Sequence, residues 1–233
     1  MNKYLRFILP SIALIFLAGA TAMQASAQGS GPLREILKRM DNNNKSLLSL
    51  KGNITMSKYN AQLRETDLTK GDLSYRPGKT EKNIFVRINW TSPVVEQLAI
   101  ANGEYVLYRP RTKQAIVGKT DSKTGNSKSG NALAFMTMSK AQLNENYEVK
   151  YAGDETLSSG ELTFHLVLIP KKPTSYKSAD LWVNKDGMPV QAKIVEKNND
   201  STTVLLTGIE RNPTLNGGVF KITPPKDTKI VRG

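Results

Sequence analysis

The residue types that most often carry catalysis are sparse in this chain. His165 is the only histidine, and there is no cysteine. His165 alternates with Phe164 and Leu166 in a strand-like run, so it lies on the opposite face from them, and a surface or edge position fits it better than a general base. One histidine without cysteine cannot form the common zinc-ligand sets. The chain also lacks a phosphate-binding glycine loop and a Gly-x-Ser-x-Gly elbow. We therefore expect no enzyme, no metal site and no cofactor.

The apolar faces of strands are the remaining candidates for a functional surface. The run NIFVRINW (Asn83 to Trp90) places four apolar residues on one face at a period of two. An Asn102-Gly103 turn, a strong hairpin signal, joins the next two strands. The run ELTFHLVLIP repeats the alternation from Leu162 onward. No catalytic group accompanies these runs, so we expect the apolar face itself to be functional.

The first 27 residues have the pattern of a secretory signal peptide. Lys3 and Arg6 precede an apolar stretch, and Ala25-Ser26-Ala27 supplies the small-x-small cleavage pattern. A retained anchor helix is the alternative, but the apolar stretch is short for a membrane span. No cysteine follows it, so we expect no lipid anchor. The expected product is a soluble, exported chain of residues 28–233.

Composition limits the class of protein and its partners. Removal of Lys3 and Arg6 from the 33 basic residues leaves 31 against 20 acidic ones, a net charge of about +11. This balance favours acidic partners or an anionic membrane surface, whereas nucleic acid is an unexpected partner for an exported chain. Without cysteine, stability must come from a hydrophobic core. The remaining length suits a single all-β domain.

Two segments have helical patterns. The spacing of apolar residues predicts a leading helix from Leu33 to Leu48. The second predicted helix, Asn131 to Leu143, is unusually apolar for a segment between loops. Residues 111–130 begin as a strand and continue in loop composition, and the lysines from Lys119 to Lys128 mark either a solvated loop or an interaction surface.

The rest of the chain reads as short antiparallel strands. About ten or eleven strands alternate with turn signals, and the last is placed at Val219 to Pro225 (VFKITPP) after the turn Asn216-Gly217-Gly218. This pattern predicts a barrel or a strongly curved sheet.

The order of these features resembles the periplasmic outer-membrane lipoprotein carrier family, LolA. The matching pieces, in chain order, are the leading helix, Gly71-Asp72-Leu73 with Arg76-Pro77, Trp90 with Pro93, Asn102-Gly103 with Tyr108-x-Pro110, DLWVNKDGMPV (Asp180 to Val190) and VFKITPP (Val219 to Pro225). The resemblance covers roughly residues 33 to 230. It implies an incomplete, unclosed antiparallel β-barrel with a helical lid over a hydrophobic cavity.

The resemblance also implies roles for residues. The lid residues that would fill an empty cavity are Leu133, Phe135, Met136 and Met138, and methionine suits this task because its side chain adapts to irregular apolar partners. Plain core packing is the alternative for these four. The expected cavity residues are Ile84, Val86, Ile88, Trp90, Leu98, Ile100, Leu162, Phe164 and Leu166.

Arg76 matches the arginine that, in the family, hydrogen-bonds lid groups and keeps the mouth shut until a lipoprotein displaces it. Pro77 holds the backbone of Arg76 extended, and the planar guanidinium can bind several carbonyl groups at once. A surface arginine at a strand end is the alternative.

The resemblance implies a monomeric periplasmic chaperone for acylated lipoproteins. It would receive them from an inner-membrane lipoprotein-releasing transporter and pass them to an acceptor or to the membrane surface at the outer membrane. Burying an acyl chain contributes about 0.8 kcal/mol per CH₂, so release requires partial burial or a lid that costs free energy to open. The charged stretch Lys79 to Lys82 and the lysine-rich loop depart from the family and bear on cargo and docking. A lipid-sensing periplasmic regulator and a carrier of another lipid are the alternative functions.

Overall fold

The computed structural model describes residues 30–78, 84–120 and 136–233. Several predictions lie outside these residues: the signal peptide, the stretch Lys79 to Lys82, most of the lysine-rich loop, and the lid residues Leu133 and Phe135.

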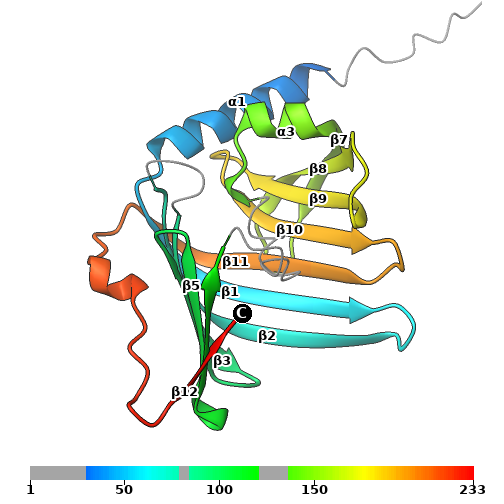
Figure 1. Ribbon diagram of the computed structural model, residues 1–233. Helices are drawn as coiled ribbons and strands as arrows, with labels where there is room; N and C mark the ends of the chain where they lie inside the picture. Colours follow the sequence, from blue (N-terminus) through cyan, green and yellow to red (C-terminus); the bar gives the residue numbers. More distant parts are fainter. Residues whose placement is uncertain (1–29, 79–83, 121–135) are drawn as a thin grey trace, which may run out of the picture.

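One sheet holds most of the described chain (Figure 1). In chain order its strands are β1 (Leu50–Asn60), β2 (Glu65–Arg76), β3 (Phe85–Ser92), β4 (Glu96–Ala101), β5 (Glu104–Arg109), β6 (Gln114–Lys119), β7 (Tyr147–Thr156), β8 (Leu162–Pro170), β9 (Tyr176–Asn184), β10 (Pro189–Glu196), β11 (Ser201–Arg211) and β12 (Lys229–Arg232). The helices are α1 (Ser30–Ser46), α3 (Lys140–Asn146) and two short 3-10 turns, η2 (Pro110–Thr112) and η4 (Gly217–Phe220).

The strands follow the order β12-β6-β5-β4-β3-β2-β1-β11-β10-β9-β8-β7 across the sheet. Strands β1 to β6 form one antiparallel series and β7 to β11 a second, and β1 joins the two by pairing with β11. Among the described strands, β12 differs in pairing parallel to its neighbour β6. Because β12 and β7 stand at opposite ends of this order, the sheet is unclosed. The predicted incomplete barrel is confirmed, with twelve strands in place of about eleven.

Helix α1 confirms the predicted leading helix, although its end differs. Pro32 lies in the first turn, where its missing N–H is tolerated. The end is set by Asn212, whose side-chain amide donates to the Ser46 carbonyl at 3.1 Å and whose Oδ1 accepts from the Leu48 N–H at 2.8 Å. Since the helix ends at Ser46, Leu48 falls outside the buried stripe, with 69% of its surface exposed.

Helix α3 begins later than predicted. Met138 and Ser139 are not helical, and the helix starts at Lys140. Ser139 is its N-cap: its hydroxyl accepts from the Gln142 N–H at 3.3 Å, and Gln142 Oε1 accepts from the Ser139 N–H at 2.7 Å. This reciprocal pair is a capping box, and it fixes Ser139 as the N-cap, so the helix starts at Lys140.

The sheet has an inner face that carries the main core and an outer face. On β2 and β3, Leu73, Tyr75, Val86 and Ile88 point inward, and α1 and α3 lie together over the inner side of the sheet (Figure 1). The intervening residues of each strand point outward, because successive side chains alternate between faces.

The C-terminal segment corrects one predicted strand. Val219 to Pro225 is not a strand: its first residues belong to η4, and residues 221–228 are irregular before β12. Asn216 starts η4, since its Oδ1 accepts from the Gly218 N–H at 2.9 Å. The apolar pattern was misleading here because Phe220 is buried outside the main core, where it packs with Phe85.

Candidate functional site

The inner face gathers nearly all the residues predicted to line a cavity. The strand register aligns these residues: Ile88 of β3 pairs with Leu73 of β2 and with Leu98 of β4, so the three side chains form one row. Four predicted residues are buried in the core and four more pack against it part-buried: Val86, Ile88, Trp90 and Leu166, then Ile84, Leu98, Ile100 and Phe164. Leu162 differs, since it is 60% exposed and lies outside this cluster.

Helix α1 covers this face with an apolar stripe. Ile36, Leu37 and Met40 are buried in the same cluster as the strand residues. Burying each such side chain contributes about 1.5–3 kcal/mol. The predicted lid residue Met136 is buried there too, and Met138 packs against the cluster. We call α1 together with residues 136–146 the lid.

Side-chain hydrogen bonds tie the lid to itself and to the sheet. Asn44 of α1 donates to the Met138 carbonyl at 3.0 Å, which joins the two parts of the lid. Arg39 donates to the Lys185 carbonyl in the β9–β10 turn at 3.3 Å. At the C-terminal end of α1, Arg211 donates to the Ser46 hydroxyl at 3.1 Å. The lid is therefore fastened by a few weak bonds, each worth about 1 kcal/mol.

Asn43 is a polar group within the apolar contact between α1 and the sheet. It is 3% exposed, and its Nδ2 lies 3.4 Å from the sulfur of Met188. Within the described ranges its Oδ1 has no hydrogen-bond partner. A buried, unpaired acceptor costs about 1–3 kcal/mol, so this residue makes the closed position of the lid less favourable.

Arg76 lies at the end of β2, on the face opposite to that of Tyr75. Its guanidinium carbon is 4.3 Å from the ring centre of Phe85, its partner on β3, and 5.3 Å from that of Phe220. Both contacts have cation–π geometry. No hydrogen bond joins Arg76 to α1 or α3 in the described part of the chain. Tyr75 packs against the core, and burial raises its pKa to about 12.

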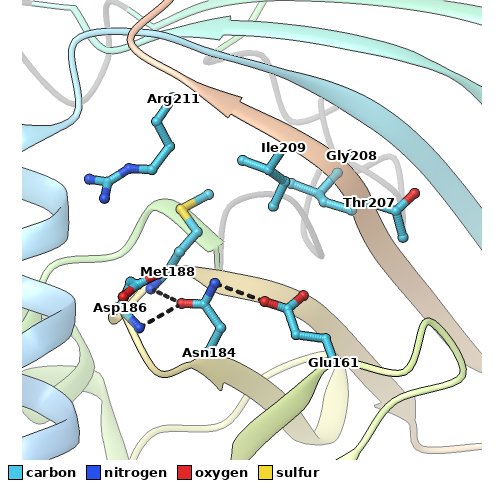
Figure 2. Close-up of a pocket in the computed structure, with 9 residues that line it drawn as sticks. Glu161, Asn184, Asp186, Met188, Thr207, Gly208, Ile209 and Arg211 are labelled. Atoms are coloured by element: carbon cyan, nitrogen blue, oxygen red, sulfur yellow. Dashed lines mark hydrogen bonds between the residues drawn. The ribbon is translucent and has the colours of Figure 1, made fainter.

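A pocket of about 220 Å³ lies between the β9–β10 turn and the end of β11 (Figure 2). Met188, Ile209 and Arg211 line it, together with a hydrogen-bonded pair in which Asn184 Nδ2 donates to Glu161 Oε1 at 3.0 Å. Sites for small molecules usually span about 300–1,000 Å³. Among the described residues, side chains of α1 and of residues 136–143 pack against the inner face.

His165 lies on the outer face, where two carboxylates hold its ring. Its Nε2 is 2.9 Å from Asp180 Oδ1 and its Nδ1 is 3.3 Å from Glu155 Oε2. The ring stacks on Trp182 with centres 4.5 Å apart, and the Trp182 indole donates to Glu155 at 2.8 Å. This ring is packed and hydrogen-bonded away from the apolar inner face. The described residues contain no cluster of three or more metal-ligating side chains.

Several residues that influence the position of the lid were not anticipated from sequence: Asn43, Asn44, Gly187 and Asn212. One signal was available. The run DNNNKS at the end of α1 is rich in poor helix formers, which is unusual for a helix interior and suits side-chain bonding to other elements. The contacts of Gly187 and Asn212 join distant parts of the chain, so no local pattern indicates them.

Within the described residues, no helix has both the length and the apolar character needed to cross a membrane.

Comparisons with known proteins agree with this arrangement. The sequence profile for "Outer membrane lipoprotein carrier protein LolA" matches residues 45–223. An outer-membrane lipoprotein carrier protein from Bordetella avium is 25% identical over 239 residues and aligns along all of both chains. Among solved structures, an uncharacterized conserved protein from Thermus thermophilus has a TM-score of 0.55 at 14% identity, covering 87% of this chain and 99% of that one. This last likeness concerns the fold.

The profile match extends over more than three quarters of the sequence, and the chain therefore belongs to the outer membrane lipoprotein carrier family, LolA.

Proposed function

We propose that this protein is a periplasmic chaperone that shields the acyl chains of lipoproteins between the inner and outer membranes. The observation that carries the proposal is the apolar inner face beneath a lid that few hydrogen bonds fasten. Such a face suits acyl chains, which offer methylene groups and no hydrogen bonds. Membership of the family supports lipoproteins as the cargo.

Cargo enters by taking the place of lid side chains. Ile36, Leu37 and Met40 are buried against the inner face, so lipid that takes their place there requires them to leave it. The lost burial is about 1.5–3 kcal/mol for each of these residues, and an incoming chain returns about 0.8 kcal/mol per buried CH₂. About six to eleven buried methylenes therefore balance the three lid residues. This near-balance permits both loading and release.

We extend the proposal to export, location and partners, on the basis of the signal-peptide pattern in residues 1–27, the family and the net positive charge of the chain. Residues 1–27 direct export and are removed, and the mature domain acts as a monomer in the periplasm. An inner-membrane lipoprotein-releasing transporter supplies cargo, and an outer-membrane acceptor or the membrane surface receives it. The excess of basic over acidic residues suits acidic partners and anionic lipid.

We retain Arg76 as the residue that controls the lid. In the closed position its guanidinium rests on Phe85 and Phe220 and makes no hydrogen bond to other described residues. A guanidinium has five N–H donors, which suit carbonyl groups of the lid or the cargo when the mouth changes shape. Arg76 lies one residue beyond Tyr75, which pairs with Leu50 at the start of β1, close to the end of α1.

The test is mass spectrometry of what co-purifies with the protein from its native periplasm, beside an Arg76→Leu variant. We expect acylated lipoproteins on the natural protein and several-fold more on the variant, because a carrier without its control residue releases cargo poorly. Arg87→Leu is the control, since Arg87 is also an outer-face arginine of the β2–β3 pair and bonds the Lys221 carbonyl.

Other outcomes separate the alternatives. Phospholipid or glycolipid in place of lipoprotein would indicate a carrier of another lipid. Equal loading of the two arginine variants would remove Arg76 from its role. No lipid on any form would contradict the carrier and favour a lipid-sensing regulator.

A further inference from the structure

The backbone of α1 rests directly on Gly187, in the turn between β9 and β10. A β-carbon built at Gly187 would lie 2.3 Å from both the carbonyl carbon and the oxygen of Arg39, and 2.7 Å from the Met40 nitrogen. Distances under 3.0 Å essentially never occur for real β-carbons. These atoms are helix backbone, so no side-chain rotation relieves the overlap. Only glycine permits α1 to come this close.

The turn that carries Gly187 is held in shape by hydrogen bonds within the turn itself. Asn184 Oδ1 accepts from the Asp186 N–H at 3.1 Å and from the Met188 N–H at 2.9 Å (Figure 2). The Gly187 N–H donates to the Asn184 carbonyl at 3.0 Å. Gly187 has a φ of +81°, a left-handed conformation that glycine adopts without strain. This turn keeps its shape and presents no side chain at Gly187, so α1 can dissociate from it and bind again in the same position.

The contacts around Gly187 are weak ones. Arg39 reaches the Lys185 carbonyl at 3.3 Å, and Asn43 meets the Met188 sulfur at 3.4 Å with its own oxygen unpaired among the described residues. The backbone contact at Gly187 thus lets α1 approach the sheet closely, while the polar atoms beside it contribute little to the stability of this contact.

We propose that Gly187 is the seat of the lid: its missing side chain determines how far α1 closes over the inner face. Asn43, next to this seat, keeps closure reversible. The inference deepens the proposed function, because it assigns the residues that set the open–closed balance of the same site.

The decisive comparison is Gly187→Ala against Gly160→Ala, measured by hydrogen exchange of the α1 amides. Gly160 lies in the β7–β8 turn with a φ of +83°, and nothing is within 4 Å of a β-carbon there. The two variants share the cost of a left-handed alanine and differ in contact with α1. We expect exchange within residues 30–46 to become at least about tenfold faster in Gly187→Ala and to stay unchanged in Gly160→Ala.

A second variant approaches the seat from the helix and covers the case in which Gly187→Ala fails to fold. Asn43→Leu removes the unpaired buried oxygen, so α1 amides should exchange at least about fivefold more slowly. Equal effects of the two glycine variants would assign the change to backbone strain and overturn the proposal. Unchanged exchange in Gly187→Ala would do the same, as would faster exchange in Asn43→Leu.

These readouts need no cargo. The absence of lipid on the purified protein would contradict the proposed carrier function. Unchanged hydrogen exchange of the α1 amides in Gly187→Ala would contradict the role of Gly187. The two failures are therefore distinguishable.

Discussion

At the scale of single residues, the buried phenol of Tyr75 links stability to pH. Its pKa is raised to about 12 in the folded protein by burial, against about 10 in an unfolded chain. Below pH 10 the phenol is neutral in both states and its full contribution is present. As the pH rises from 10 toward 12, the unfolded state ionises first, and this stability is lost.

We expect a Tyr75→Phe variant to lose less stability than the natural protein as the pH rises from about 9 to about 11.5. The full difference in pKa corresponds to about 3 kcal/mol at the upper end of the titration. Urea unfolding at a series of pH values measures it. Tyr59→Phe serves as the control because Tyr59 is exposed at the end of β1, and parallel profiles for all three proteins would contradict the argument.

Asn212 is a second residue whose effect is measurable alone. Its side chain bonds the Ser46 carbonyl and the Leu48 N–H, and its φ of +58° is left-handed. Asn212→Gly keeps this conformation accessible and removes both bonds, so we expect a loss of about 1–2 kcal/mol in the free energy of unfolding. Asn102→Gly, at an exposed turn with a φ of +53°, is the matched control in the same denaturant titration. Equal midpoints for the two variants would refute the capping role.

At the scale of elements, the question is whether α1 is an integral part of the folded core. Met40 is fully buried at the centre of its apolar stripe, and Leu48, just past its end, is 69% exposed. The proposed carrier function requires a lid that is stable enough to protect the inner face and weak enough to move. The contribution of each α1 residue to this balance can be measured as the change in the free energy of unfolding when it is replaced by alanine.

We expect Met40→Ala to destabilise the protein by about 2–5 kcal/mol, and Leu48→Ala to change stability by less than about 0.5 kcal/mol. Chemical denaturation monitored by circular dichroism provides the comparison. If Met40→Ala costs no more than Leu48→Ala, the helix spends most of its time away from the sheet, and the closed lid described above is not the resting state.

Local patterns in the sequence predicted the elements better than their contacts. Period-two alternation placed Val86, Ile88 and Trp90 on one face, because that alternation is a property of the strand itself. The capping box at Ser139 has the recognisable sequence S-x-x-Q, whereas apolar spacing alone places the start of this helix at Asn131. The position of Arg76 against Phe220 depends on where residues 217–228 cross the sheet, and no local pattern contains that information.

At the scale of the whole molecule, the sheet consists of two antiparallel series joined along β1 and β11. The C-terminal segment reinforces the first series from outside, where Phe220 packs with Phe85 at 5.7 Å between ring centres. Phe220 and Phe85 thus form a small cluster on the outer face that is separate from the core of the inner face. The overall class was predictable for this reason: many short strands with one apolar face require either a closed barrel or a cover.

The β1–β11 junction also has a consequence for the order of folding. Each series can form from hairpins between neighbouring strands, but the junction pairs Ile54 with Leu206, residues far apart in the chain. Contacts of such large sequence separation form slowly, because a long loop must close first. Helix α1 is attached to the first series and rests on the second, at Gly187. We therefore expect α1 to reach this contact only after the two series have met, which would leave the apolar interior assembled but uncovered for a time.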